Sequence, residues 1–149
     1  MSDEPLASDE YPSLAAGVLL FDDEGRVLLV HQNYGQRMWS LPGGMIDPGE
    51  APHETAVREA REEIAVDVEL ERLVGVYYLR RRHPGIRFVF QGRVSDGRRP
   101  VISDDELDDL GWFAPGALPP RHLATVPAAI ADAVAGLTGV TRSLDDPNA

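Results

Sequence analysis

The sequence contains no cysteine, no long apolar run and comparatively little positive charge. The absence of cysteine excludes disulfides, thiolate catalysis and cysteine-ligated zinc, and it agrees with a reducing cytoplasm. No apolar stretch approaches the ~20 residues that a bilayer-spanning helix needs. The acidic N-terminus also lacks the basic region and apolar stretch of a secretory signal. We therefore expect a soluble cytoplasmic protein without a membrane partner.

Acidic residues outnumber basic ones, with 25 Asp and Glu against 14 Lys and Arg, which gives a formal net charge of -11. This excess repels a nucleic-acid backbone and an anionic membrane surface at long range. A nucleic-acid polymer is therefore not an expected partner. A small anionic ligand remains compatible with the charge, because a metal ion or a local group of arginines reverses the field within one cleft.

The 149 residues are enough for one domain with a sizeable core. Residues 1–12 and 138–149 are polar, acidic or proline-containing and have no apolar period. Such segments bury too little apolar surface to fold, so both are expected to be flexible tails. A single domain is therefore predicted over residues 13–137.

Apolar periodicity predicts an α/β domain. Strands are expected at 14–21, 27–30, 66–79, 87–94, 101–102 and 111–113. A polar, glycine-containing loop over 33–44 leads to an amphipathic helix that begins near residue 50 and ends near residue 65. A second helix is expected within 118–137, and its regular part should begin at Pro127, because proline is poorly tolerated inside a helix.

Three glutamates of the first predicted helix share one narrow stripe. At roughly 100° per residue, Glu62 and Glu63 lie within about 60° of Glu59 on either side. Like charges at these spacings destabilise a helix by roughly a few tenths of a kcal/mol per pair unless a partner offsets them. A bound divalent cation would offset this repulsion, although such a stripe taken alone is more typical of a solvated helical face with Arg58 and Arg61 interleaved.

The segment around these glutamates resembles the Nudix box, in which Gly, five residues, Glu and seven residues precede Arg-Glu-apolar-x-Glu-Glu-x-Gly-apolar. Residues 44–66 read GMIDPGEAPHETAVREAREEIAV. The matching positions are Gly44, Glu50, Arg58, Glu59, Ala60, Glu62, Glu63 and Val66. The departure is Ala65, where glycine is usual. Ala65 either tolerates a left-handed backbone, at roughly 1 kcal/mol, or extends the helix slightly.

Membership of this family would imply an α/β/α sandwich with a mixed central sheet. It would also imply metal-dependent hydrolysis of a nucleoside diphosphate linked to another group, as in nucleoside triphosphates, nucleotide sugars or ADP-ribose. Carboxylates without histidine or cysteine partners favour Mg2+ or Mn2+ over zinc. Such ions neutralise phosphate charge and activate water. The resemblance further suggests a homodimer.

The resemblance also assigns roles to individual residues. The Gly43 carbonyl, Glu59, Glu62 and Glu63 would bind metal, and Glu59 or Glu62 would activate water. Glu50 and Arg58 resemble a pair that braces the loop against the helix. Glu106 is expected as a further metal ligand, because its spacing to a following Trp-Phe pair resembles the family arrangement. The alternatives in the same acidic segment are Asp104, Asp105, Asp108 and Asp109.

A dense basic cluster contains Arg80, Arg82 and Arg87. We hypothesise that one or two of these arginines contact the phosphate or sugar of the substrate, with solvated strand ends as the competing interpretation. Aromatic residues in strands are more often core than nucleobase platforms, and no aromatic or histidine is assigned to the site. The unassigned residues are Tyr34, Tyr77, Tyr78, Phe90, His31 and His122.

A non-catalytic nucleotide-binding or regulatory module with the same fold is the alternative function. Such modules usually have a damaged box, whereas every acidic position is intact here. The sequence therefore favours an enzyme. It does not identify the group joined to the nucleoside diphosphate.

Overall fold

The computed structural model describes residues 11–146. The predicted tails therefore lie outside the described residues at 1–10 and 147–149. The elements in chain order are β1 (Ser13–Leu20), β2 (Val27–Gln32), β3 (Trp39–Ser40), β4 (Gly43–Met45), α1 (Pro52–Ile64), β5 (Val68–Arg80), β6 (Gly85–Val94), β7 (Leu107–Phe113), α2 (Thr125–Val134) and β8 (Val140–Asp145).

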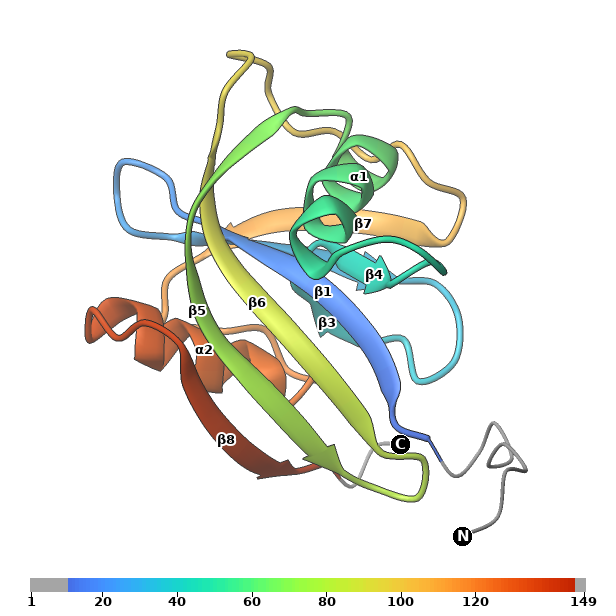
Figure 1. The fold of residues 1–149 in the computed structure, drawn as a ribbon. Helices are drawn as coiled ribbons and strands as arrows, with labels where there is room; N and C mark the ends of the chain where they lie inside the picture. Colours follow the sequence, from blue (N-terminus) through green and yellow to red (C-terminus); the bar gives the residue numbers. More distant parts are fainter. Residues whose placement is uncertain (1–10, 147–149) are drawn as a thin grey trace, which may run out of the picture.

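Two sheets lie between the two helices (Figure 1). The larger sheet has the order β4-β1-β6-β5-β8, and the smaller one has the order β3-β2-β7. In the larger sheet β1 pairs with β6, and β5 with β8, in parallel, whereas β4 and β1, like β5 and β6, are antiparallel. Helix α1 packs on β1 and β4, and α2 packs on β5 and β6. The predicted sandwich with a mixed central sheet is confirmed.

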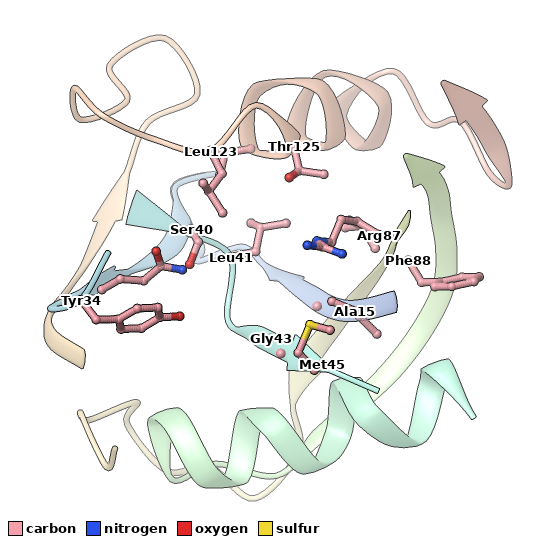
Figure 2. A pocket seen from close by; sticks show the side chains of 16 residues that line it. Ala15, Tyr34, Ser40, Leu41, Gly43, Met45, Arg87, Phe88, Leu123 and Thr125 are labelled. Atoms are coloured by element: carbon pink, nitrogen blue, oxygen red, sulfur yellow. The ribbon is translucent and has the colours of Figure 1, made fainter. Parts of the chain in front are cut away.

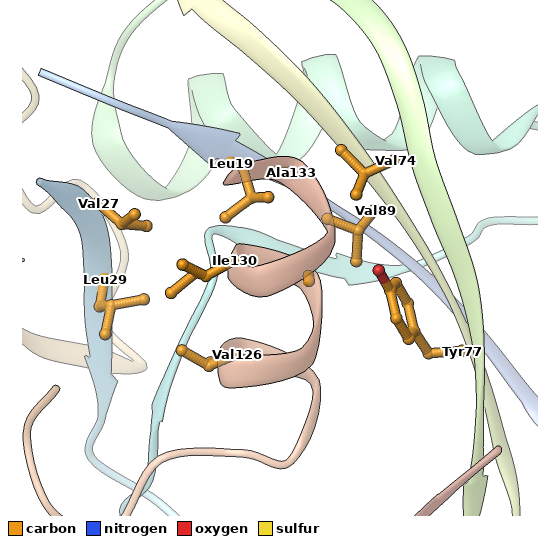
Figure 3. Packing of buried hydrophobic residues seen from close by; sticks show 10 residues of the cluster. Leu19, Val27, Leu29, Val74, Tyr77, Val89, Val126, Ile130 and Ala133 are labelled. Atoms are coloured by element: carbon orange, nitrogen blue, oxygen red, sulfur yellow. The ribbon is translucent and has the colours of Figure 1, made fainter. Parts of the chain in front are cut away.

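The alternation of side chains along β1 divides the core between the two helices. Val18 and Leu20 belong to the cluster that packs with α1, whereas Leu19 belongs to the cluster that packs with α2. Figure 3 shows Leu19 together with Val126 and Ile130 in the α2 cluster. Both faces of the sheet are therefore covered, which fixes the position of α1 relative to β1 and β4.

Helix α1 begins and ends with identifiable local devices. Pro52 occupies its first turn, where a missing N–H costs nothing, and the Glu54 carboxylate accepts a hydrogen bond from the Ala51 amide at 3.0 Å. Ala65 ends the helix with φ 57° and ψ 36°. It therefore adopts the left-handed conformation instead of extending the helix.

Three predicted segments differ from the structure. Residues 140–145 form β8 and pair with β5, so the prediction of a flexible tail from residue 138 is wrong for them. Hydrogen bonding across the sheet orders these residues in spite of their polar character. Residues 101–102 form no strand, since the Val101 amide donates instead to the carbonyl of Ile64 at the end of α1. Helix α2 begins at Thr125, with Pro127 in its first turn.

No helix among residues 11–146 is both long and apolar enough to cross a membrane.

Candidate active site

An acidic cavity of about 650 Å³ lies between β4, α1 and the segment before β7. We call it the carboxylate cavity. Its acidic lining residues are Asp47, Glu59, Glu62, Glu63, Asp104, Asp105 and Glu106. The structure thus brings the three glutamates of α1 together with Glu106, although these residues are more than 40 positions apart in the chain.

Two adjacent glycines let β4 approach both β1 and the helix. A Cβ on Gly43 would lie 2.4 Å from the carbonyl oxygen of Ala16, and a Cβ on Gly44 would lie 2.5 Å from the Glu59 carboxylate. Neither position therefore tolerates a side chain without movement of the backbone or of Glu59. Close packing against β1 and Glu59 therefore requires glycine at both positions. The sequence alone indicates only a tight turn here.

Glu63 is buried beneath β4. Its carboxylate accepts a hydrogen bond of 2.6 Å from the Gly43 amide, and the residue is only 9% exposed. Burial raises the pKa of Glu63 to about 8, and the nearby Glu59, Asp104 and Glu106 carboxylates add to this effect, whereas the Gly43 amide opposes it. A buried carboxylate surrounded by others is destabilised in its charged form, so the position favours a bound cation.

Arg58 ties the loop after β4 to α1. Its guanidinium donates to Glu50 at 2.7 and 3.0 Å and to the carbonyl of Met45 at 3.1 Å. The Glu50 carboxylate also accepts from the Thr55 hydroxyl and the Asp47 amide. These bonds hold the pKa of Glu50 near 2. This geometry matches the bracing role that the resemblance implies.

The same arginine also reaches the two remaining glutamates. Nη1 of Arg58 lies 2.9 Å from Glu59 and 3.1 Å from Glu62. Burial still raises the pKa of Glu59, with Glu62 and Asp104 adding to the rise, while Arg58 opposes it. Glu62 is about half exposed, at 53% of its side chain. One arginine is thus shared among four carboxylates, those of Asp47, Glu50, Glu59 and Glu62, and leaves the cavity strongly acidic.

The segment that carries Glu106 is fastened at both ends. The Ser103 amide donates to the carbonyl of Glu63, and the Asn33 amide donates to the carbonyl of Glu106, each at 2.9 Å. Asp104 and Asp105 line the same cavity as Glu106, whereas the Asp108 carboxylate contacts His31 at 2.6 Å. Asp104, Asp105 and Glu106 line the cavity, whereas Asp108 and Asp109 do not, and the choice of Glu106 as the distal ligand stays a prediction.

The donor set fits a hard divalent cation. Within residues 11–146, no three acidic or histidine side chains are close enough to form a ready-made metal cluster as they are placed. Glu63 instead binds the Gly43 amide, while Glu59 and Glu62 bind Arg58. The side-chain oxygens that line the cavity are carboxylates together with the hydroxyls of Ser103 and Tyr34, and such oxygen ligands suit Mg2+ or Mn2+. The chemistry of the cavity therefore fits such an ion, provided that these side chains turn toward it.

A second cavity of about 190 Å³ adjoins the first between β1, β4, β6 and the start of α2 (Figure 2). We call it the Arg87 cavity. Arg87 is part of its lining, but Arg80 and Arg82 are exposed and line neither cavity. The structure thus brings only one of the three predicted arginines close to the site.

Tyr34 lines both cavities and is 50% exposed. The sequence interpretation left it unassigned. Its position in a polar, glycine-containing loop, instead of a strand, is the signal that distinguishes it from the aromatic residues of the core. Tyr77, in contrast, is fully buried and bonds to Asp132 through its hydroxyl.

Comparisons with known proteins agree with this geometry. The model of the NUDIX domain matches residues 12–134. The chain is 35% identical over 104 residues to a Bacillus subtilis protein provisionally named 8-oxo-dGTP diphosphatase, covering 70% of this chain and 68% of that one. It is 32% identical over 111 residues to the ADP-ribose pyrophosphatase of Mycobacterium tuberculosis, covering 66% of this chain and 51% of that one. It therefore spans about half of the second relative.

A solved structure agrees over most of the fold. The MutT NUDIX hydrolase from Burkholderia pseudomallei superposes with a TM-score of 0.76 at 26% identity, covering 82% of this chain and 98% of that one. The family model, in turn, covers the segment that holds the glycine pair, α1 and the acidic lining of the cavity. The chain belongs to the Nudix hydrolase family, as the resemblance of residues 44–66 predicts.

Proposed function

We propose that this protein hydrolyses the phosphoanhydride bond of a nucleoside diphosphate joined to another group, with Mg2+ or Mn2+ as cofactor. The observation that carries the proposal is the carboxylate cavity, in which acidic groups from α1 face acidic groups from the segment before β7, and Arg58 pairs only with those of α1 and the loop before it. Relatives named for 8-oxo-dGTP and ADP-ribose hydrolysis support this reaction class.

Glu59, Glu62, Glu63 and the Gly43 carbonyl would hold the metal, with Glu106 or a neighbouring aspartate as the distal ligand. When bound, the ion supplies charge neutralisation for the diphosphate and lowers the pKa of water. Glu59 or Glu62 then accepts the proton of the attacking water. Arg58 and Glu50 keep α1 and the loop after β4 in register, so that these carboxylates face one cavity.

The two adjoining cavities suggest how a substrate is divided. The carboxylate cavity is large enough for a diphosphate with its metal, whereas the Arg87 cavity, at about 190 Å³, is smaller than ordinary ligand sites of about 300–1,000 Å³. The smaller cavity would therefore take one ring or one sugar, not a whole nucleotide. Tyr34 forms part of the wall that both share.

A substrate panel tests the proposal. Purified protein is incubated with nucleoside triphosphates, nucleotide sugars, ADP-ribose and dinucleoside polyphosphates, with Mg2+, with Mn2+ or with EDTA. We expect metal-dependent cleavage of at least one class, and 18O-labelled water should place the label on the attacked phosphorus. Absence of turnover throughout the panel would contradict the proposal. Saturable nucleotide binding without turnover would instead support a non-catalytic nucleotide-binding module.

We further propose that the enzyme acts in the cytoplasm on small nucleotides, not on nucleic-acid polymers. The formal net charge of -11 supports the second part, because it repels a polyanion beyond the immediate site. A homodimer remains an expectation from the family. Sedimentation at several protein concentrations would test it.

A further inference from the structure

Arg87 has an unusual environment for an arginine. It projects from β6 into the Arg87 cavity, and Figure 2 shows its guanidinium extending toward Leu41. No carboxylate among residues 11–146 lies within 4.0 Å of it, although the Asp146 carboxylate, which pairs with Arg81 at 3.1 Å, is near enough to favour the charged form of Arg87. Burial and the nearby Arg81 lower the pKa of Arg87 to about 10, so that it remains charged at neutral pH. A partly buried cation thus lines the cavity without an ion-pair partner.

One edge of this guanidinium is already used. Nη1 donates to the carbonyl and the hydroxyl of Ser13 at 3.1 and 3.2 Å and to the carbonyl of Ile86 at 3.2 Å. Nη2 shares the Ser13 hydroxyl at 3.3 Å. The other edge, formed by Nε and the second hydrogen of Nη2, donates to no residue of the described chain. This edge is the planar fork that binds two adjacent acceptors side by side.

Gly85 holds the fork in place. It lies two residues before Arg87 on β6, and a Cβ there would lie 2.9 Å from Nη1 and 3.0 Å from both Cζ and Nη2. The guanidinium therefore rests directly on the backbone of Gly85. A Cβ at this position would therefore require the guanidinium to shift from its observed place.

The rest of the cavity offers flat apolar walls and a few hydroxyls. Leu41, Val89 and Leu123 contribute apolar surface, while Ser40 and Thr125 add hydroxyl groups. These two hydroxyls form no side-chain hydrogen bond within residues 11–146, and no polar side-chain atom in this part of the chain is both buried and unsatisfied. Both hydroxyls therefore retain hydrogen-bonding capacity for water or for a ligand in the cavity that they line.

We infer that Arg87 determines substrate specificity by binding, through its Nε and Nη2 edge, a pair of adjacent acceptors on the non-reacting end of the substrate. The inference rests on the proposed function for the identity of the ligand as a nucleotide derivative. Two sources carry such a pair: the O6 and N7 atoms of guanine, which arginine binds in this manner, and an anionic carboxylate or phosphate on the other group. Gly85 is the positioning residue for this contact.

Two matched substrate pairs distinguish these sources. GTP and ATP differ in the base edge, and UDP-glucuronate and UDP-glucose differ in a carboxylate against a hydroxymethyl group. kcat/KM is measured with Mg2+ for all four, and calorimetric affinity replaces it for any pair that is not turned over. We expect the wild type to favour the acceptor-bearing member of at least one pair by about tenfold or more, the scale of one bidentate contact.

The variants then test whether the preference belongs to Arg87. Arg87→Met should reduce the preference to about twofold or less. Gly85→Ala should reduce it in the same direction while keeping the arginine. Arg87→Lys should retain part of a preference for the carboxylate but not for the base edge, because lysine supplies charge without the fork. Arg82→Met is the matched control, since Arg82 is exposed and lines neither cavity, and it should leave the preference unchanged.

A purely structural role of Arg87 predicts a different result. Loss of the bonds to Ser13 would then lower the melting temperature and reduce activity on all four nucleotides equally, with the preference intact. A preference that survives Arg87→Met, or no preference of the wild type in either pair by either assay, would overturn the inference. If binding discriminates between the members of a pair through Arg87 but no substrate is turned over, the inference about Arg87 is supported and the proposed hydrolysis is rejected.

Discussion

Two buried acidic residues, one on each helix, have opposite environments. Asp132 on α2 is 4% exposed and accepts bonds of 2.8 and 2.7 Å from Arg142 and one of 2.8 Å from the Tyr77 hydroxyl. These bonds lower the pKa of Asp132 below its ordinary value. Glu63 on α1 is 9% exposed and accepts one backbone amide bond, and its pKa rises to about 8.

The difference separates a structural charge from a functional one. Asp132 is neutralised by groups of the protein itself, so its network is complete without a ligand. Glu63 lies among further carboxylates, and the single nearby arginine is used by Glu50, Glu59 and Glu62. A buried charge that the fold leaves uncompensated is a candidate for binding an external cation. The comparison therefore supports the prediction that α1, and not the Asp132 network of α2, carries the metal site.

The largest expected effect comes from removing the uncompensated charge. Glu63→Gln should reduce metal-dependent hydrolysis by roughly 10²–10³-fold, the scale seen when one preorganised charge-stabilising group is lost. The metal-free protein should be at least as stable as wild type, because glutamine keeps an acceptor for Gly43 and needs no bound proton to stay neutral in the buried position. Steady-state kinetics and urea unfolding in EDTA measure the two effects. Full activity in this variant would refute the site.

The second effect is a pH dependence of the stability of the metal-free protein, to which Glu63 should contribute most and the raised pKa of Glu59 should add in the same direction. Its pKa is about 8 in the folded state and lies near 4.5 ordinarily, so the folded protein retains a proton that the unfolded chain has lost. This contribution is complete below about pH 4.5 and is lost as the pH rises toward 8, by an amount on the order of a few kcal/mol. Urea unfolding in EDTA from pH 5 to 8 should show falling stability.

Glu63→Gln is the control for this slope, and it should flatten the decline. Asp132 should act in the other direction, because its lowered pKa makes its contribution present above the ordinary value of 3.8 and lost as the pH falls below it. A decline of equal steepness in wild type and Glu63→Gln would show that other groups control the pH dependence.

Breaking the compensated site should change stability and leave chemistry in place. Asp132→Asn removes the charge that pairs with Arg142 and weakens the bond from the Tyr77 hydroxyl. We expect the free energy of unfolding to fall by about 2 kcal/mol, a value kept low because the Arg142 side chain is 44% exposed and its ion pair is screened by solvent. Urea unfolding measures the loss, and kcat under conditions where the variant is folded should stay within a factor of about two, since less than 1 kcal/mol is involved. A large fall in kcat of the folded variant would contradict the division between the helices.

The sequence alone predicts those parts of the site whose residues lie at fixed spacings along one helix and the loop before it. The stripe of Glu59, Glu62 and Glu63 and the bracing pair follow from helical periodicity and from the resemblance. The short strands β3 and β4 were placed in a loop, because Gly43 and Gly44 have little intrinsic preference for a strand. Strand β4 pairs with β1 through the close backbone approach that glycine permits, whereas β3 pairs with β2. Strand β8 was missed for a similar reason, since its pairing with β5 is a tertiary effect.

The two cavities depend on contacts that are distant in sequence. Arg87 was grouped with Arg80 and Arg82 because they are neighbours in a basic cluster, but strand alternation and the hairpin at 81–84 separate them in space. Tyr34 was not assigned, because its role depends on the segment before β7, which the Asn33 amide and side chain bind. Single-sequence patterns do not contain such pairings.

The smallest expected effect concerns the end of α1. Ala65 has φ 57°, a conformation that costs an L-residue about 1–2 kcal/mol. Glycine avoids this cost, but its greater conformational freedom in the unfolded chain offsets part of the gain in stability. Ala65→Gly should therefore stabilise the protein by about 0.5–1 kcal/mol, measured by urea unfolding. Activity should change little, because the carboxylates precede this residue. Destabilisation would show that alanine is accommodated without strain.

The central claim is that α1 carries a divalent-cation site, and calorimetric titration of Mn2+ into the protein tests it most directly. Wild type and Asp132→Asn should both bind Mn2+ saturably with similar affinity. Glu63→Gln should bind at least about tenfold more weakly, the lower limit for loss of a group that supports a metal. Equal affinity of Glu63→Gln and wild type, or no saturable binding by wild type, would contradict the account.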